Sequence, residues 1–161
     1  RSSLVTGVQT CALPISSPQL FLGYLNNENN HKYFMSLDNK NFFKTGDLAY
    51  FDKDGYFFVV DRLKRMINSS GYKIWPAEIE KILHSFEGIK EVCVIGVPDL
   101  RSGQKVKAII VPENSHSEKK ITNLKQWCSS RMAKYKIPKI FEIRKSLPKN
   151  NMGKIMWREV K

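Results

Sequence analysis

The sequence predicts an α/β protein whose larger part is a compact α/β sandwich. Two patterns predict this class. Residues 72–143 alternate in the order β-α-β-β-α-β, and the region from Phe21 to Asp61 is rich in aromatic and β-branched residues. The chain has 161 residues, 42% of them hydrophobic, which suits one domain, or one small domain with a piece of another. We therefore expect a short mixed sheet flanked by helices and preceded by hairpin strands.

Residues 1–15 carry no helical or strand pattern that continues into the rest of the chain. The first residue is Arg1 rather than Met, so we interpret the sequence as a fragment or a processed product. A signal peptide is a poor interpretation because the segment lacks a continuous apolar core of about 7–15 residues. The segment resembles the translated read-through of a sequencing-library adapter, so we expect it to be non-native and leave it out of the predicted fold.

Strands are predicted at Phe42–Phe43, Leu48–Phe51 and Tyr56–Val60, where aromatic and β-branched residues gather. Between the last two lies Asp52–Gly55, whose Asp-Gly ending is typical of a tight hairpin turn. An EF-hand calcium loop is excluded because no acidic series continues to a Glu at the twelfth position. The segment therefore indicates a turn and no metal site.

After Asp61 we expect a polar loop at Asn68–Gly71 and a short strand at Tyr72–Ile74. Pro76 then begins a helix in its first turn, where Glu78 and Glu80 suit the positive end of the helix dipole. Apolar residues follow at helical spacing and lead to a glycine stop: Ile79, Ile82, Leu83, Phe86 and Gly88.

Four more elements complete the predicted order: strands at Val92–Val97 and Val106–Val111, a helix at roughly Glu118–Met132, and a strand at Ile140–Ile143. Cys128 lies on the apolar stripe of that helix with Ile121, Leu124 and Met132, which favours a core cysteine over a reactive thiol. Pro148–Gly153 is a loop, and Lys154 begins a short terminal turn or helix.

The net charge of +12 is unevenly distributed. Residues 119–161 contain 13 Lys and Arg against 2 Asp and Glu, a net +11, whereas residues 1–118 contain 14 against 13. Such a block indicates either a polyanionic partner (nucleic acid, a phosphorylated cofactor or an acidic membrane) or a solvated lysine-rich surface.

The three cysteines are widely separated and no pair has metal-ligand spacing, which with only three histidines argues against a zinc site. Widely spaced cysteines and short apolar runs predict a cytoplasmic protein without a membrane span.

Two short motifs carry chemistry only weakly when each is taken alone. In Lys44–Asp47 a carboxylate follows a glycine between two strands, where it can accept both hydroxyls of a ribose or simply bond its own turn. Gly153-Lys154 places a lysine behind a flexible glycine. It is not a Walker phosphate loop, because Pro148 stands at the earlier glycine position and Ile155 replaces the Ser or Thr.

Four blocks taken together are much more specific: Phe43–Asp47, Val60–Ile67, Ser70–Glu80 and Pro148–Lys154. In this order and spacing they resemble the adenylate-forming superfamily of acyl-CoA synthetases, peptide-synthetase adenylation domains and luciferases. The wording VDRLK and WPAEIE is most similar to medium- or long-chain fatty-acid CoA ligases. The resemblance runs from about Gly23 to the end of the chain.

The resemblance implies an enzyme that uses ATP and Mg²⁺ to activate a carboxylic acid as an acyl-adenylate and then transfers the acyl group to CoA. It also implies two domains, of which residues 16–61 would end the large one and residues 65–161 would form a small lid. The hinge would lie at residues 62–64, with Lys64 at the family's pivot position. The lid would rotate between the two half-reactions.

Residue roles follow from the same resemblance. ATP or AMP would be bound by Asp47 at the ribose hydroxyls, Arg62 at ribose and phosphate, Lys73, and Lys154, which would also be the catalytic residue. On the other face of the lid, CoA would contact Ser70, Gly71, Tyr72, Arg101, Tyr135 and Lys136. No residue of the chain is expected to bind a metal directly.

Three positions depart from the family pattern. Asn68 stands where many relatives carry a lysine, Asn150–Met152 replaces the usual Ser or Thr of the last loop, and Trp157 occupies the usual arginine position. These departures concern phosphate contacts in the last loop rather than Lys154.

We expect the C-terminal part of an ATP-dependent acyl-CoA ligase, inactive without the rest of its parent chain, because the phosphate loop and acyl pocket would lie in the missing large domain. Its partners would be a small carboxylic acid, ATP and CoA, with no nucleic acid and with peripheral membrane contact left open. One alternative is an adenylation domain that loads a carrier-protein phosphopantetheine. A second is a basic nucleic-acid-binding module that stacks bases on Trp127, Tyr135 and Trp157.

Overall fold

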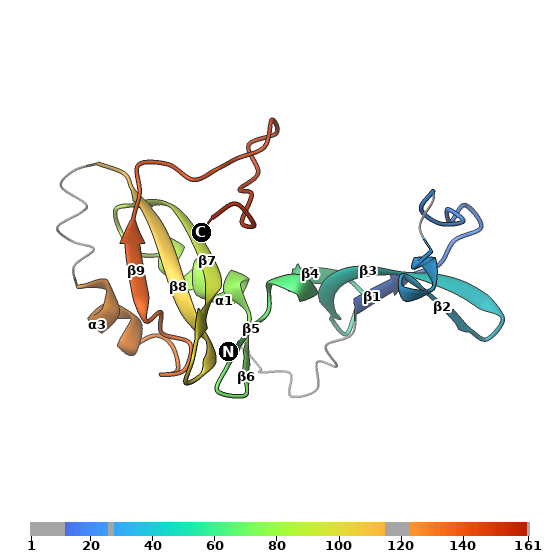
Figure 1. The fold of residues 1–161 in the computed structure, drawn as a ribbon, viewed down its shortest axis with the longest axis horizontal. Coiled ribbons are helices and arrows are strands. Elements are labelled where there is room, and N and C mark those ends of the chain that lie inside the picture. The colour runs from blue at the N-terminus through green and yellow to red at the C-terminus, as the bar shows by residue number, and fades with distance from the viewer. Residues whose placement is uncertain (1–11, 26–27, 115–122, 161) are drawn as a thin grey trace. The chain divides into compact units, whose positions relative to one another are not determined.

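The computed structural model describes residues 12–25, 28–114 and 123–160. The chain divides into two compact units, Arg1–Lys64 and Arg65–Lys161 (Figure 1). The division falls directly after Lys64, the residue expected at the hinge. Strands dominate both units and helices are few, which confirms the predicted mixed class.

Unit 1 is a four-stranded antiparallel sheet centred on one long strand. Its strands are β1 (Ala12–Ile15), β2 (Phe34–Leu37), β3 (Lys40–Phe51) and β4 (Phe57–Arg62), and the 3-10 turn η1 (Asn30–Lys32) precedes β2. Strands β1, β2 and β4 all pair with β3. The predicted hairpin is confirmed, because the Asp52 carboxylate accepts bonds from the Asp54 and Tyr56 amides at 3.0 Å and fixes the turn.

Two strands of unit 1 were not expected, β2 and β1, and the second comes from the segment left out of the predicted fold. Ala12–Ile15 pairs with β3, and the Thr45 hydroxyl donates to the Leu13 carbonyl at 2.9 Å. A strand of four residues is too short to show the alternation on which a sequence prediction depends, and its hydrogen bonds come from a segment about 30 residues away. Leaving this segment out of the fold was therefore wrong for residues 12–15, whatever their origin.

In its described residues, unit 2 is a five-stranded sheet with two helices. Its strands are β5 (Ile67–Ser69), β6 (Tyr72–Ile74), β7 (Ile89–Asp99), β8 (Gly103–Pro112) and β9 (Ile140–Ile143), and its helices are α1 (Pro76–His84) and α3 (Leu124–Ser129). The 3-10 turn η2 (Leu63–Arg65) spans the boundary, with Leu63 and Lys64 in unit 1 and Arg65 in unit 2. The order is β6-β5-β8-β7, and β9 pairs with β8 in parallel. One parallel pair among antiparallel ones makes this the predicted mixed sheet.

The two helices differ in how well the sequence anticipates them. Helix α1 begins at Pro76 as expected and buries Ile79 and Leu83, but it ends at His84, before Phe86. Helix α3 covers only six residues of the range expected to be helical, whose residues 118–122 lie outside the described part. It ends at Ser129, where the Ser129 and Ser130 hydroxyls bond carbonyls of the last turn.

The core of unit 2 occupies both faces of the β7–β8 pair. Val92 and Val94 face one cluster together with α1 and α3, while Cys93 and Ile95 face a second cluster covered by residues of the C-terminal tail. Burial on both faces explains why β7 reads as a continuous apolar run. Cys128 is fully buried in the first cluster, as predicted, and burial raises the pKa of both the Cys93 and Cys128 thiols to about 11.

No helix in the described part of the chain is both long and apolar enough to cross a membrane.

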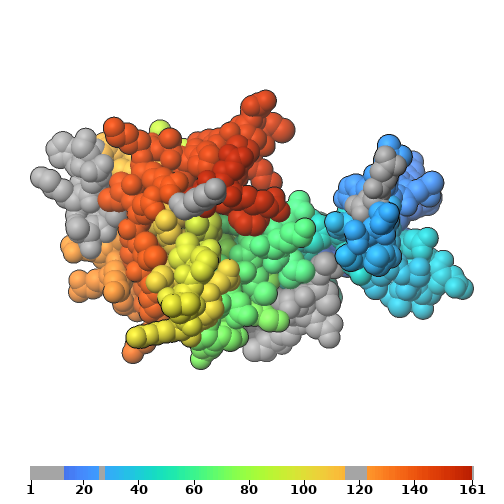
Figure 2. Space-filling model, viewed as in Figure 1, coloured from blue at the N-terminus to red at the C-terminus, as the bar shows by residue number. Residues whose placement is uncertain are grey.

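The basic C-terminal segment forms a large part of the surface of unit 2. Residues 123–160, orange to red in the space-filling view, cover much of the visible side of unit 2 (Figure 2). Eight of its cationic residues are exposed: Lys125, Arg131, Lys134, Lys139, Lys145, Lys149, Lys154 and Arg158.

Candidate active site

Asp47 and Arg62 are brought together by the β3–β4 ladder, where they are directly paired. The Arg62 Nε lies 2.7 Å from the Asp47 carboxylate, and its Nη1 donates to the Thr45 carbonyl at 3.1 Å. The Asp47 side chain is 22% exposed and that of Arg62 is 57% exposed. An accessible carboxylate beside a guanidinium can accept bonds from ribose hydroxyls while the cation meets a phosphate.

Asp61 is a residue of this region that the sequence analysis did not single out. It is only 7% exposed, and its carboxylate accepts a bond from the Arg62 amide at 2.7 Å. Through this bond Asp61 fixes the backbone of Arg62. A carboxylate at the end of an apolar strand, directly before the arginine, is the signal that could have identified it.

The Ser70-Gly71 pair forms the two-residue turn of the β5–β6 hairpin. Both residues have positive φ, 51° and 82°, which is the geometry of a type I′ turn. Strand β5 includes Asn68 and Ser69, so the expected four-residue polar loop was too long by two residues. The Ser70 amide donates to the Ser102 carbonyl at 2.8 Å, which places the turn beside the loop that carries Arg101.

Asp99 organises that β7–β8 loop. Its carboxylate accepts bonds from the Ser102 hydroxyl at 2.7 Å, the Ser102 amide at 3.1 Å and the Lys105 ammonium at 3.1 Å. These donors, with the Ser102 hydroxyl first, lower the pKa of Asp99 to about 2. Since Ser102 also accepts the bond from Ser70, Asp99 indirectly supports the hairpin turn.

We expect acid to loosen this loop. The pKa of Asp99 in the folded chain lies below that of the unfolded chain, 3.8, so its contribution to stability is present above pH 4 and is lost as the pH falls toward 2. An NMR titration of the Ser102 amide should show a shift with a midpoint near pH 2. Asp99→Asn should abolish that shift, and a shift unchanged in the variant would contradict the assignment.

Tyr72 of β6 and Tyr135, which follows α3, stack on each other. Their ring centroids are 4.4 Å apart with planes 14° from parallel. The neighbouring Lys136 ammonium lies 2.5 Å from the Glu78 carboxylate and 5.7 Å from the Tyr135 ring. Three of the residues expected to contact CoA therefore form one group, in which the two tyrosines are exposed and Lys136 is half-buried.

Lys73 does not join that group. It pairs with Asn68 in the β5–β6 ladder and is exposed. Side chains alternate along a strand, so Lys73 points away from the side on which Tyr72 and the buried Ile74 lie. The structure thus brings Lys73 together with none of the other site residues in unit 2.

The loop before Lys154 is held by Asn150, one of the positions that depart from the family pattern. Its side-chain oxygen accepts bonds from the Met152 amide at 3.0 Å and the Lys154 amide at 2.8 Å. Gly153 turns the chain with φ of 78°, and Lys149 pairs with Ile155 across the loop. The loop is a tight turn that presents the exposed Lys154 side chain on a fixed backbone.

Trp157, which stands at the family's usual arginine position, packs against the core and supplies no positive charge there. It lies against the second core cluster, with the Arg65 guanidinium 6.0 Å and the Arg158 guanidinium 4.6 Å from its ring. Val160, at 4% exposure, is buried in the same cluster. The tryptophan and the valine therefore hold the tail that carries Lys154 against the sheet.

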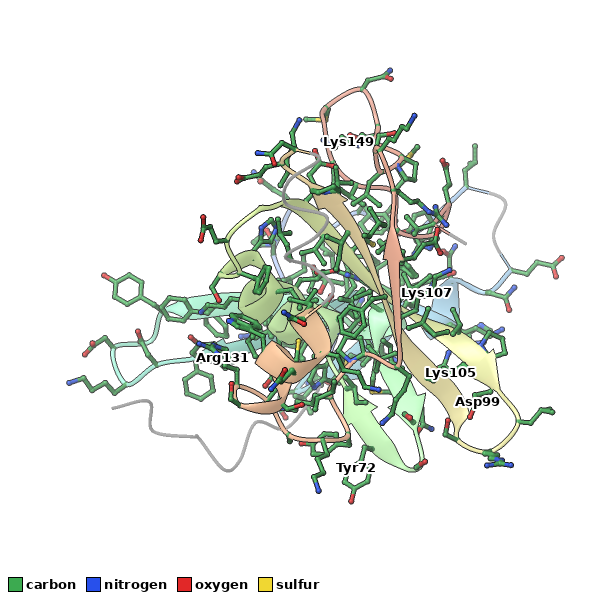
Figure 3. All side chains as sticks on the ribbon, turned by 90° about the vertical axis from the view of Figure 1, so that its left-hand side faces the viewer. Tyr72, Asp99, Lys105, Lys107, Arg131 and Lys149 are labelled. Carbon is green, nitrogen blue, oxygen red and sulfur yellow. The ribbon has the colours of Figure 1, made fainter. Side chains whose placement is uncertain are left out.

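The Lys154 loop and the β5–β6 hairpin lie at opposite ends of unit 2. Lys149, at the base of the loop, is at the top of Figure 3, whereas Tyr72 is at the bottom. Within unit 2 Lys154, expected to serve adenylation, is thus separated from the residues expected to contact CoA. Lys73, expected at ATP, instead lies in β6 of the hairpin at the CoA end. Asp47 and Arg62 belong to unit 1.

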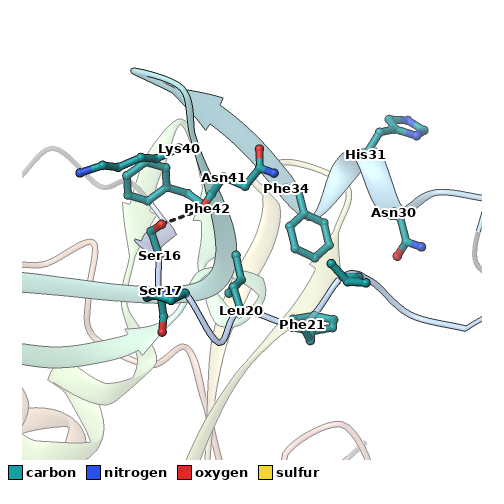
Figure 4. A pocket seen from close by; sticks show the side chains of 12 residues that line it. Ser16, Ser17, Leu20, Phe21, Asn30, His31, Phe34, Lys40, Asn41 and Phe42 are labelled. Atoms are coloured by element: carbon teal, nitrogen blue, oxygen red, sulfur yellow. Dashed lines mark hydrogen bonds between the residues drawn. The ribbon is translucent and has the colours of Figure 1, made fainter.

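Unit 1 also contains a pocket of about 840 Å³ that no motif indicates (Figure 4). Aromatic and polar side chains line it, among them Phe21, Phe34, His31 and Lys40. The rings of Phe21 and Phe34 contact each other with centroids 5.3 Å apart. None of the predicted site residues lines this pocket.

The described residues contain no group of three or more His, Cys, Asp or Glu side chains arranged to hold a metal ion.

Comparison with known proteins gives a consistent result. Residues 78–154 match the model of the AMP-binding enzyme C-terminal domain. A long-chain-fatty-acid–CoA ligase of Bacillus subtilis (strain 168) is 37% identical over 146 residues, covering 91% of this chain and 25% of the relative. A feruloyl-CoA synthase of Amycolatopsis sp is 46% identical over 119 residues, covering 74% and 24%. The chain spans about a quarter of the length of these relatives.

A solved structure supports the same grouping. The o-succinylbenzoate CoA synthetase of Bacillus subtilis, in complex with its acyl-adenylate intermediate, superposes with a TM-score of 0.77 at 34% identity. The match covers 92% of this chain and 29% of that one.

Proposed function

Since residues 78–154 are an AMP-binding enzyme C-terminal domain and the chain is related to CoA ligases, we propose that it is the C-terminal part of an ATP-dependent acyl-CoA ligase. The resemblance that the four sequence blocks indicated is thereby confirmed. In this proposal unit 2 is the lid, unit 1 ends the large domain, and residues 62–64 are the hinge. A cytoplasmic location is part of the same proposal.

One observation carries the proposal furthest. The family match ends at Lys154, and the Lys154 loop lies at the opposite end of unit 2 from the hairpin that would contact CoA. An enzyme that forms an adenylate and then a thioester needs two sets of groups that act in turn. A lid with one set at each end supplies both by rotating between the two steps.

In the adenylation step, Lys154 would lie between the attacking carboxylate of the substrate and the α-phosphate of ATP. Its ammonium would stabilise the negative charge that develops there in the transition state. Asp47 would accept bonds from the ribose hydroxyls, and Arg62 would contact ribose and phosphate. Mg²⁺ would accompany the ATP phosphates, but no side chain of this chain is assigned to it.

In the thioester step, the β5–β6 hairpin would line the path of the pantetheine arm. Gly71 leaves open space where a Cβ would stand, so a ligand can approach its backbone. Arg101 and Lys136 would contact the CoA phosphates, and the basic surface of residues 123–160 would attract so anionic a substrate. These cations favour free CoA over a tethered phosphopantetheine, which carries fewer charges.

The acid is proposed to be a medium- or long-chain fatty acid. The VDRLK and WPAEIE blocks and the long-chain-fatty-acid–CoA ligase relative support this choice. A similar C-terminal region occurs in a relative named for another acid, the feruloyl-CoA synthase. Substrate choice would therefore depend on the missing large domain.

The proposal is tested by activity with and without the rest of the parent chain. We expect the full-length parent to release AMP when ATP, a fatty acid and CoA are all supplied. The purified 161-residue chain should form no acyl-adenylate, because the acyl pocket and the phosphate loop are not in it. Acyl-adenylate formation by the chain alone, or AMP release by the parent without CoA transfer, would contradict the proposal.

A further inference from the structure

Two arginine side chains bracket the link between the units, one in each unit. Arg62 is the last residue of β4, and its guanidinium is held by Asp47 and the Thr45 carbonyl, all in unit 1. Arg65 is the first residue of unit 2. Only Leu63 and Lys64 lie between these two residues, and both are exposed.

Arg65 is fixed within unit 2 by three partners. Its guanidinium pairs with the Glu80 carboxylate of α1, and its Nη2 donates to the Val94 carbonyl of β7 at 3.4 Å. The same Glu80 carboxylate accepts a bond from the Val94 amide at 2.8 Å. The guanidinium also lies 6.0 Å from the ring of Trp157. One side chain thus joins the start of unit 2 to a helix, a strand and the C-terminal tail.

The Arg65–Glu80 pair differs from an ordinary surface ion pair. The two side chains are only 16% and 18% exposed, whereas Arg62 on the other side of the link is 57% exposed. A shielded guanidinium with several partners is screened little by salt and has little freedom to move. The backbone of Arg65 should therefore move with unit 2 although regular pairing begins only at Ile67.

We propose that Arg65 is a positioning residue that ends the flexible link at Lys64, so that rotation between the units is confined to Leu63 and Lys64. Without this anchor the link would extend from Leu63 to Met66, twice as many residues. A short pivot restricts the positions that unit 2 can take. Through its contact with Trp157, Arg65 also holds the start of unit 2 beside the C-terminal tail that carries Lys154. The motion rests on the proposed function, but the anchor does not.

Backbone ¹⁵N relaxation on the 161-residue chain tests this without any substrate. We expect order parameters below about 0.6 at Leu63 and Lys64 and near 0.85 from Arg65 onward. In Arg65→Met, the low values should extend through Met66. Arg65→Lys, which keeps one charge for Glu80, should give intermediate values at Arg65 and Met66. Lys145→Met removes a cation from an exposed position of unit 2 and should leave the profile unchanged.

The outcomes separate the anchor from the proposed function. Any one of three results would overturn the inference. These are low order parameters that already continue to Met66 in the unsubstituted chain, high order parameters at Leu63 and Lys64, or an unchanged profile in Arg65→Met. Chemical shifts of β7 and β8 report whether the variant folds; if Arg65→Met does not fold, the unsubstituted chain and Arg65→Lys still decide. A parent enzyme without ligase activity would overturn the proposed function and leave this result intact.

Discussion

Lys154→Ala in the full-length parent is expected to lower the rate of acyl-adenylate formation by about 10²–10³, which corresponds to roughly 2.7–4 kcal/mol of lost transition-state stabilisation. The ammonium would act only while charge develops at the α-phosphate. Thioester formation from a supplied acyl-adenylate and CoA should therefore proceed at the unsubstituted rate. Adenylation is measured by acyl-AMP formation, and thioester formation by release of acyl-CoA from the supplied intermediate.

The structure makes this substitution specific for the side chain. The loop is held by the Asn150 side chain bonding the backbone amides of Met152 and Lys154, and alanine keeps that amide. Lys145→Ala, at an exposed lysine of the same tail, is the matched control for loss of one positive charge and should leave both half-reactions unchanged. Equal losses in the two variants would mean that Lys154 acts only through the general charge of the tail.

Gly71→Leu is expected to have the opposite selectivity. The leucine side chain would fill the open space beside the turn and obstruct the pantetheine arm. Displacing a reacting group by about 1 Å can cost on the order of 10²-fold in rate. Thioester formation should fall by about that factor, while adenylation continues, because the hairpin lies at the other end of unit 2 from Lys154.

Backbone strain needs its own control, since Gly71 has φ of 82° and a side chain in that conformation costs about 1–2 kcal/mol. Gly55 has φ of 84° in the β3–β4 hairpin and likewise leaves open space for a Cβ. Gly55→Leu therefore introduces the same strain at a turn with no proposed ligand. It should lower stability about as much as Gly71→Leu without affecting thioester formation selectively.

The sequence predicted well those elements whose pattern is local. Strand β9 has the predicted bounds Ile140–Ile143, and the Asp52–Gly55 turn lies where an Asp-Gly pair requires it. Elements decided by distant partners were missed or misjudged. Strand β1 exists through its pairing with β3, and the Thr45 hydroxyl bonds the Leu13 carbonyl across 32 residues. Helix α3 was misjudged for a local reason, because the Ser129 and Ser130 hydroxyls bond carbonyls of its last turn.

For the candidate site, too, local features could be predicted and long-range contacts could not. Motif residues such as Asp47 and Arg62 could be named from the sequence, and the β3–β4 ladder pairs them. The contacts that support them could not. Arg65 meets Glu80 across 15 residues and Trp157 across 92, and Asp99 reaches Ser70 only through Ser102. Such contacts depend on the folded sheet, because no local spacing relates the residues.

Whether the two ends of unit 2 serve two different steps is decided by measuring both half-reactions in both variants of the parent. We expect a crossed result: Lys154→Ala loses adenylation and keeps thioester formation, whereas Gly71→Leu keeps adenylation and loses thioester formation. If both substitutions impair the same half-reaction, the assignment of separate ends to separate steps is wrong.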